Sequence, residues 1–296
     1  MDPQLDHWHR LLADDRPDTD FRPLVQLVRR LDAQQLQQHM SRVLPLSLRL
    51  LDHHFVPNKL LGVHTISHLT QHLPADTLAK TGTDALLIHS LKSCLVHEDM
   101  VLAVLPVLIN AMKRTNTDPV SDDADDVTLS IVRGLDLATA LSSKLVFWKA
   151  LSLVIDFVGL AIIRLSKRIV RRISDHLTYP LTGESKAMFC ELLQTTDAFV
   201  QATRERADRF SAEILFAVCS FSYSNFLVIS SRSNGSNQIR NHVLTLMRSV
   251  HEVDAQSFQH VMHVMEANDP EDRMSLILKD LKCQTQAHVQ SDTRTG

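Results

Sequence analysis

The sequence predicts an all-α protein, a HEAT/armadillo-like α-solenoid of antiparallel helix pairs. Glycine is scarce, with 7 residues in 296, and β-turns and phosphate-binding loops depend on it. Tyrosine and tryptophan number two each, so aromatic residues that favour strands are few. Apolar residues instead recur at three- and four-residue steps through most of the chain, which is the pattern of helices packed on one side.

The composition indicates a folded protein and disfavours several classes of function. Hydrophobic residues make up 44% and charged residues 22%, and the formal net charge of -3 gives no global attraction to nucleic acid. The four cysteines are far apart and lie in apolar helical contexts, so we expect reduced, mostly buried thiols in an intracellular protein. We expect no signal peptide. Lys149, Asp156 and Arg164 interrupt the most apolar stretch, which disfavours a membrane helix.

The apolar pattern in the N-terminal part of the sequence predicts helix pairs with short connections. The expected elements are a flexible lead-in over residues 1–20 and helices over residues 24–40, 43–51, 60–73, 84–95 and 101–112. Only about six residues join the helices that end at Asp52 and begin near Lys59, so these two helices must lie antiparallel. The pair then recurs with a period near forty residues, as HEAT and armadillo units do. We therefore assign residues 21–113 to N-terminal HEAT-like repeats.

An acidic segment separates this block from a second helical block. Residues 114–128 contain a proline and five aspartates, four of which lie close together at Asp122, Asp123, Asp125 and Asp126, and we interpret the segment as a mobile, solvated surface loop. Helical periodicity resumes at Leu129 and continues to Leu177, with breaks expected near residues 141–144 and around Gly159. Residues 129–283 are assigned to C-terminal HEAT-like repeats and residues 284–296 to a polar tail.

One group of positively charged residues is denser than is usual on the exposed side of a helix in a soluble protein. The basic strip consists of Arg164, Lys167, Arg168, Arg171 and Arg172. Apolar residues supply the other side of the same predicted helix, so the strip faces either solvent or an acidic partner. Three interpretations stay open, namely a plain solvated face, a surface that binds protein, and a nucleic-acid site. The last is disfavoured because no aromatic residues for base stacking lie nearby.

The sequence offers no catalytic, cofactor or metal site. His64, His68 and His72 share one helix edge, but no further ligand is placed near them, so we assign them an ordinary structural role. The glycine-rich and nucleophile-elbow motifs of nucleotide and acyl-transfer enzymes are missing. Trp148, in an apolar helix, is expected in the core. We therefore predict a non-enzymatic protein that needs no cofactor.

Residues 42–73, RVLPLSLRLLDHHFVPNKLLGVHTISHLTQHL, resemble a HEAT unit. Pro45 lies early in the first helix, Asp52 ends it, and Lys59 opens the second, as in the HEAT signature. The same segment, together with LAKTGTDALLIHSLKSCL and FWKALSLVIDFVGLAIIRLSKRIVRRISDHLTYPL, is similar to the Tti-two family of Tel-two-interacting proteins. The resemblance covers residues 40–230.

This resemblance implies a scaffold subunit of the Triple-T complex with Tel-two and Tti-one. That complex acts as a cochaperone with the heat-shock-protein-ninety system and supports the maturation and stability of phosphatidylinositol-three-kinase-related kinases. It implies no catalytic residue. We expect the protein in the cytoplasm and allow for the nucleus. The alternative is a helical-repeat adaptor for transport or nucleic-acid-associated complexes that uses the basic strip.

Overall fold

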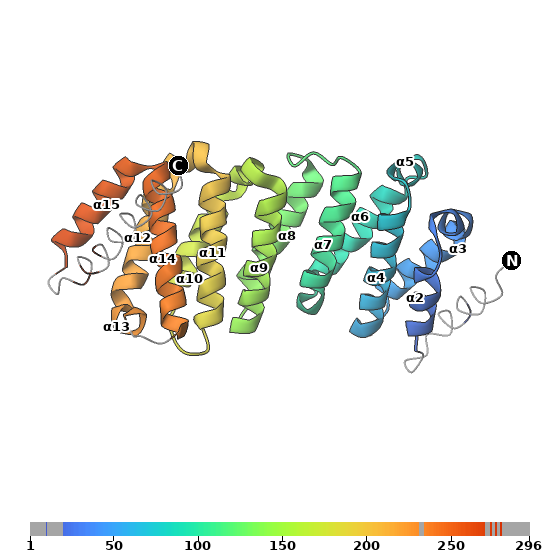
Figure 1. Cartoon of the computed structure of the whole chain (residues 1–296), viewed down its shortest axis with the longest axis horizontal. Coiled ribbons are helices and arrows are strands. Elements are labelled where there is room, and N and C mark those ends of the chain that lie inside the picture. The colour runs from blue at the N-terminus through green and yellow to red at the C-terminus, as the bar shows by residue number, and fades with distance from the viewer. Residues whose placement is uncertain are drawn as a thin grey trace, which may run out of the picture. The chain divides into compact units, whose positions relative to one another are not determined.

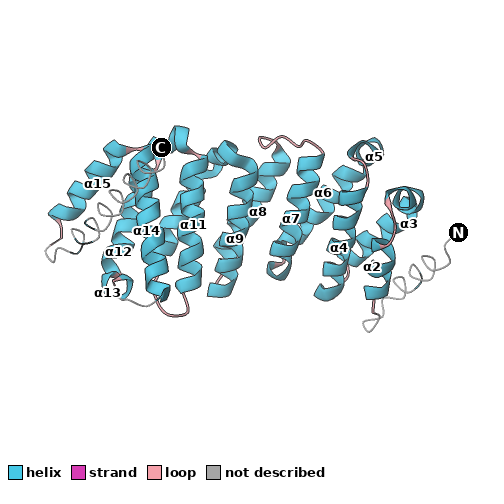
Figure 2. Cartoon of the chain, viewed as in Figure 1, coloured by secondary structure: helices cyan, strands magenta, loops and turns pink. Residues whose placement is uncertain are grey.

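The computed structural model describes residues 20–230 and 234–269, together with Arg10, Arg273, Leu276 and Lys279. Every regular element in these residues is a helix (Figure 2). The chain divides into two compact units, Met1–Ile131 and Val132–Gly296. The prediction of an all-α fold made of packed helix pairs is confirmed. The polar tail, Cys283 and the lead-in, apart from Arg10 and Asp20, lie outside the described residues.

The N-terminal unit consists of helices that pair with their neighbours along the chain. Its elements are α2 (Arg22–Arg29), α3 (Ala33–Leu51), α4 (Val56–His72), α5 (Ala75–Lys80), α6 (Thr83–Ser93), η1 (Cys94–Val96), α7 (Glu98–Arg114) and the first part of α8 (Asp122–Leu137). Helix α3 packs against α4, α6 packs against α7, and α4 and α7 contact each other. The short connections predicted for these pairs therefore return each helix beside its predecessor.

The first predicted helix, residues 24–40, is in fact parts of two helices. Helix α2 ends at Arg29, and Asp32 caps a new helix, α3. The Asp32 carboxylate accepts from the Gln35 backbone N–H at 2.8 Å, and the Gln35 side chain accepts from the Asp32 N–H at 3.1 Å. This reciprocal pair satisfies two backbone donors that a helix start leaves open. The predicted helix over residues 43–51 is the second half of α3, with Pro45 inside it.

The acidic segment 114–128 is not a loop throughout, so that prediction is wrong for its second half. The loop runs only from Thr115 to Ser121, and α8 begins at Asp122. Asp122, Asp123 and Asp125 occupy the first turn of α8. Negative side chains at this end interact favourably with the helix dipole, so the aspartates stabilise a helix start.

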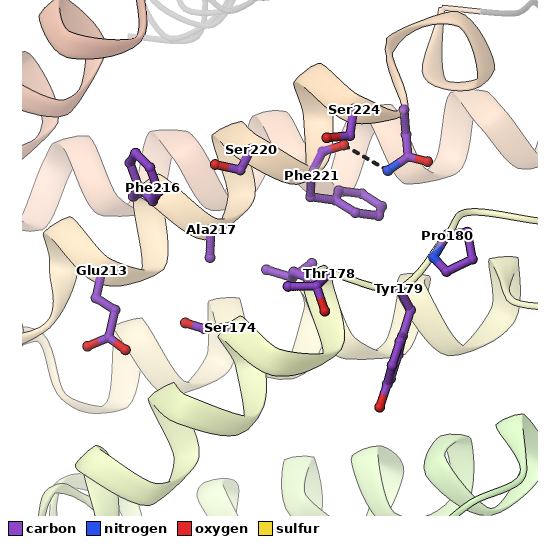
Figure 3. Close-up of a pocket in the computed structure, with 12 residues that line it drawn as sticks. Ser174, Thr178, Tyr179, Pro180, Glu213, Phe216, Ala217, Ser220, Phe221 and Ser224 are labelled. Atoms are coloured by element: carbon purple, nitrogen blue, oxygen red, sulfur yellow. Dashed lines mark hydrogen bonds between the residues drawn. The ribbon is translucent and has the colours of Figure 1, made fainter.

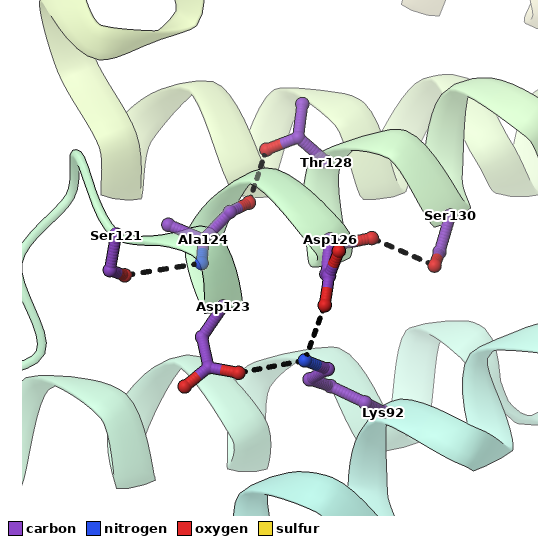
Figure 4. Close-up of polar contacts among 7 residues, drawn as sticks. All are labelled: Lys92, Ser121, Asp123, Ala124, Asp126, Thr128 and Ser130. Carbon is purple, nitrogen blue, oxygen red and sulfur yellow. Dashed lines mark hydrogen bonds and ion pairs between the residues drawn. The ribbon is translucent and has the colours of Figure 1, made fainter.

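Packing and ion pairs hold the start of α8 in the N-terminal unit (Figure 4). The Lys92 ammonium group lies 2.7 Å from Asp123 Oδ1 and 2.8 Å from Asp126 Oδ2. Ala124 and Val127 are buried with 1% exposure each. The acidic run forms a helix here for two reasons. Lys92 neutralises the carboxylates of Asp123 and Asp126, and the neighbouring apolar residues Ala124 and Val127 reach the core.

The C-terminal unit has two rows of helices. After the end of α8 its elements are α9 (Leu141–Val158), η2 (Gly159–Leu165), α10 (Ser166–Leu177), α11 (Lys186–Ala202), η3 (Arg204–Arg209), α12 (Ser211–Ser224), α13 (Phe226–Ile229), α14 (Asn234–Val253) and α15 (Ala255–Ala267). Helices α9, α11 and α14 pack side by side, and α10, α12 and α15 form the other row (Figure 1). Trp148 is fully buried, which confirms its predicted place in the core.

The most apolar stretch of the chain, Leu141–Leu177, is broken rather than continuous. By length and composition alone it could cross a membrane, and 44% of its most apolar window is buried within the protein. Gly159 interrupts it with φ 53° and ψ -130°, a conformation that favours glycine, and the 3-10 segment η2 follows. The predicted break at Gly159 is confirmed. The other predicted break lies slightly earlier than expected, at residues 138–140.

Candidate functional site

The basic strip lies on η2 and α10, mostly exposed to solvent. Lys167, Arg168 and Arg171 are exposed residues of α10. Arg164 is also exposed but belongs to η2, so the expectation of one continuous helix through the strip is wrong. The break at Gly159 forces this tighter segment before α10 begins. The strip is therefore a line of cations along α10, preceded by one cation from the 3-10 turn.

Arg172 differs from Lys167, Arg168 and Arg171 because it forms ion pairs with two carboxylates of the C-terminal unit. Its guanidinium group forms an ion pair with Asp136 through Nε and a second with Asp175 Oδ2 at 3.0 Å. Its side chain is 29% exposed. Arg172 therefore fixes the end of α8 to α10, whereas Lys167, Arg168 and Arg171 have no carboxylate partner among the described residues.

An apolar groove lies between the C-terminal half of α10 and α12 (Figure 3). Its volume is about 760 Å³. The lining residues are Ser174, Leu177, Thr178, Tyr179, Pro180, Glu213, Phe216, Ala217, Ser220, Phe221, Ser224 and Asn225. Phe216 is 52% exposed at its edge, and Phe221 is 2% exposed beneath it. An exposed aromatic side chain next to a groove of this kind is a typical feature of protein-binding surfaces.

Asn225 closes one end of the groove. This residue follows α12, and its side-chain Nδ2 donates to the Phe221 carbonyl at 2.9 Å. Its Oδ1 accepts from the Leu181 N–H at 3.3 Å, in the turn that follows α10. One amide thus links the ends of both walls, so the groove has a fixed width at this end.

A buried polar cluster supports the α10 wall from behind. The Trp148 indole N–H donates to His176 Nδ1 at 3.0 Å. Because an indole nitrogen can only donate, His176 must be neutral with its proton on Nε2. Burial, with Lys144 and Arg172 nearby, lowers the pKa of His176 to about 4. The imidazole therefore stays uncharged at neutral pH and acts as a structural acceptor.

Tyr179 joins this cluster at the end of α10. Its ring stacks on His176, with centroids 5.5 Å apart, and the Lys144 ammonium lies 4.1 Å from the Tyr179 centroid. Lys144 is only 8% exposed. A cation over an aromatic face is stabilised without a carboxylate. The cluster thus fixes the turn that leads from α10 to the closed end of the groove.

The histidines considered for metal binding take part in ordinary helix contacts. The rings of His68 and His72 lie 4.1 Å apart, and His68 Nε2 is 3.4 Å from the Leu31 carbonyl oxygen. Burial lowers the pKa of both His64 and His68. No group of three or more histidine, cysteine or acidic side chains within the described part of the chain is placed to hold a metal ion.

Comparisons with known proteins show similarity to one family over part of the chain. Residues 23–112 match the model of the Tti2 family. TELO2-interacting protein 2 from Homo sapiens is 27% identical over 182 residues, which are 58% of this chain. The chain covers 35% of that relative and so spans about a third of its length. No solved structure matches.

Proposed function

We propose that this chain is a scaffold subunit of a Triple-T-like complex, in which it binds Tel-two and Tti-one homologues. Two similarities support the proposal, the match of residues 23–112 to the Tti2 family model and the likeness of the chain to TELO2-interacting protein 2. The observation that carries the proposal is the similarity to a human protein that is named for its interaction with TELO2. Within each unit the packed helix pairs present faces of the kind that helical repeats use to bind other proteins. We further propose that this complex supports the maturation of phosphatidylinositol-three-kinase-related kinases, in the cytoplasm and the nucleus.

The proposed role is binding without catalysis. Hydroxyl groups and the single carboxylate of Glu213 are the side-chain polar groups that line the groove, besides the Asn225 amide. A nucleophile needs an adjacent base, and no histidine, lysine or cysteine lines this groove. The surfaces offered for binding are the apolar groove and the basic strip, with Lys167, Arg168 and Arg171 as its exposed helical part.

Affinity purification of the tagged chain at moderate salt, followed by mass spectrometry, tests this proposal. We expect Tel-two and Tti-one homologues to co-elute in near-stoichiometric amounts. Depleting the chain should then lower the abundance of the kinases while their messenger RNA stays constant. Recovery of nucleic acid or transport factors in place of these partners would refute the proposal and favour the adaptor function of the basic strip.

A further inference from the structure

We infer that the groove between α10 and α12 binds an amphipathic helix of a partner protein, whose apolar side enters the groove and whose acidic edge contacts Lys167 and Arg171. The inference rests on the proposed scaffold function and specifies one binding surface for it. The proposed occupant of the groove is a protein helix with acidic residues along one side.

The α12 wall has the dimensions of a site for a short helix. Glu213, Ala217, Ser220 and Ser224 follow one another at steps of four, three and four residues, so they form one stripe along α12. From Glu213 to Ser224 this stripe is about 16 Å long, or about three helical turns, at 1.5 Å per residue. Phe216 lies beside it, and Figure 3 shows Phe221 reaching between the two walls.

Small side chains on this wall permit close approach of a second helix. Ala217 and Ser220 lie between the aromatic residues Phe216 and Phe221, and both are partly exposed. Ridges of a docked helix can enter such a depression and bury the exposed ring of Phe216. Burial of one aromatic ring in a fitted groove is the usual source of a binding hot spot. The apolar side of the partner helix is therefore expected to meet Phe216.

The charge of the α10 wall selects the partner. Lys167, Arg171, Ser174 and Thr178 fall at steps of four, three and four residues, so all four share one edge of α10. Ser174 and Thr178 line the groove, and the two cations extend the same edge beyond Ser174. Neither cation has a carboxylate partner within the described residues. A partner helix with acidic residues on its α10 side would complement them.

Glu213 sets the orientation of the partner helix. It is exposed on the α12 wall, across from Ser174 (Figure 3). A carboxylate there repels acidic residues, so the acidic edge must face α10 and not α12. It also disfavours a phosphate backbone in the groove, because a nucleic acid presents negative charge to both walls.

Site-specific crosslinking in the intact complex tests the inference. A photoreactive benzoylphenylalanine replaces Phe216 in the full chain, which is co-expressed with its Tel-two and Tti-one homologues. The second variant carries Lys167→Glu and Arg171→Glu. The matched control carries Arg204→Glu and Arg206→Glu, which reverse two exposed charges of η3 outside the groove. Circular dichroism melts confirm that all variants fold.

We expect a crosslink from position 216 to a helical segment of a partner protein that carries acidic residues along one side. The Lys167→Glu/Arg171→Glu variant should reduce the crosslink yield, and the affinity for the partner pair, by about tenfold or more. The η3 control should change neither by more than about twofold. A crosslink to a second copy of this chain or to nucleic acid would overturn the inference.

A further outcome separates this inference from the proposed function. If the complex forms normally but position 216 gives no crosslink, or gives one that charge reversal does not affect, the groove assignment is wrong and the scaffold function stands. If the unmodified chain forms no complex with these partners, the proposed function fails and the groove inference fails with it.

Discussion

Replacing Gly62 with valine is expected to destabilise the N-terminal unit by about 3 kcal/mol or more. Gly62 lies in α4 where this helix crosses α3 at close range. A Cβ atom built at Gly62 would lie 2.7 Å from the Leu51 backbone nitrogen and 3.0 Å from the Leu50 carbonyl carbon. Both are backbone atoms of α3, which cannot move aside as a flexible side chain can. The helices would have to separate and open the core between them.

Gly62→Ala gives a sharper version of the same test. Helix propensity alone favours alanine over glycine by about 1 kcal/mol, so a net loss of stability must come from the close contact. The matched control is Gly235→Ala in α14, where the new Cβ would meet only the flexible side chain of Lys186, at 3.2 Å. We expect urea denaturation to show a loss of stability for Gly62→Ala and no loss, or a gain of up to about 1 kcal/mol, for the control. Equal stability of the two variants would contradict the observed α3–α4 contact.

Acidification is expected to destabilise the C-terminal unit through His176. In the unfolded chain the imidazole takes up a proton below about pH 6.5, whereas in the folded protein its pKa is lowered to about 4. The unfolded state therefore binds more protons between these values, and the free energy of unfolding falls as the pH falls. Lowering the pKa from 6.5 to about 4 corresponds to a contribution of roughly 3 kcal/mol, most of which is lost by pH 4. Above pH 6.5 this contribution is constant.

His176→Gln isolates this effect from the titration of other groups. Glutamine keeps an acceptor for the Trp148 indole N–H but does not titrate. Urea denaturation at pH 7.5 and pH 4.5 should show a smaller pH-dependent loss in the variant than in the unmodified chain. At pH 7.5 the variant should be less stable by about 1 kcal/mol, because the Tyr179 stacking is lost. The same pH dependence in both chains would contradict a neutral, buried His176.

Helix pairs could be predicted from the sequence because their cause is local. The apolar steps around Leu87 and Leu105 are enough to place α6 and α7, since each helix buries its own stripe. The start of α3 was missed although its signal is present, an aspartate three residues before a glutamine. An apolar residue on either side of Asp32 masked this capping box.

The acidic segment and the groove depend on residues that are distant in sequence. Asp123 and Asp126 suggest a loop when considered alone, and only Lys92, about thirty residues earlier, neutralises them. The exposed positions of the basic strip could be predicted, but the ion pair of Arg172 with Asp136 could not, because it joins two different helices. The groove requires α10 and α12 to lie side by side, which no local pattern encodes.

Reconstitution from purified proteins shows whether this chain binds partner proteins without other cellular factors. The purified chain is mixed with purified Tel-two and Tti-one homologues, and the mixture is analysed by size-exclusion chromatography with light scattering. We expect a single species whose mass equals the sum of one copy of each protein. Elution of the chain alone, at its own mass of 33.4 kDa, beside a complex of the other two would contradict it.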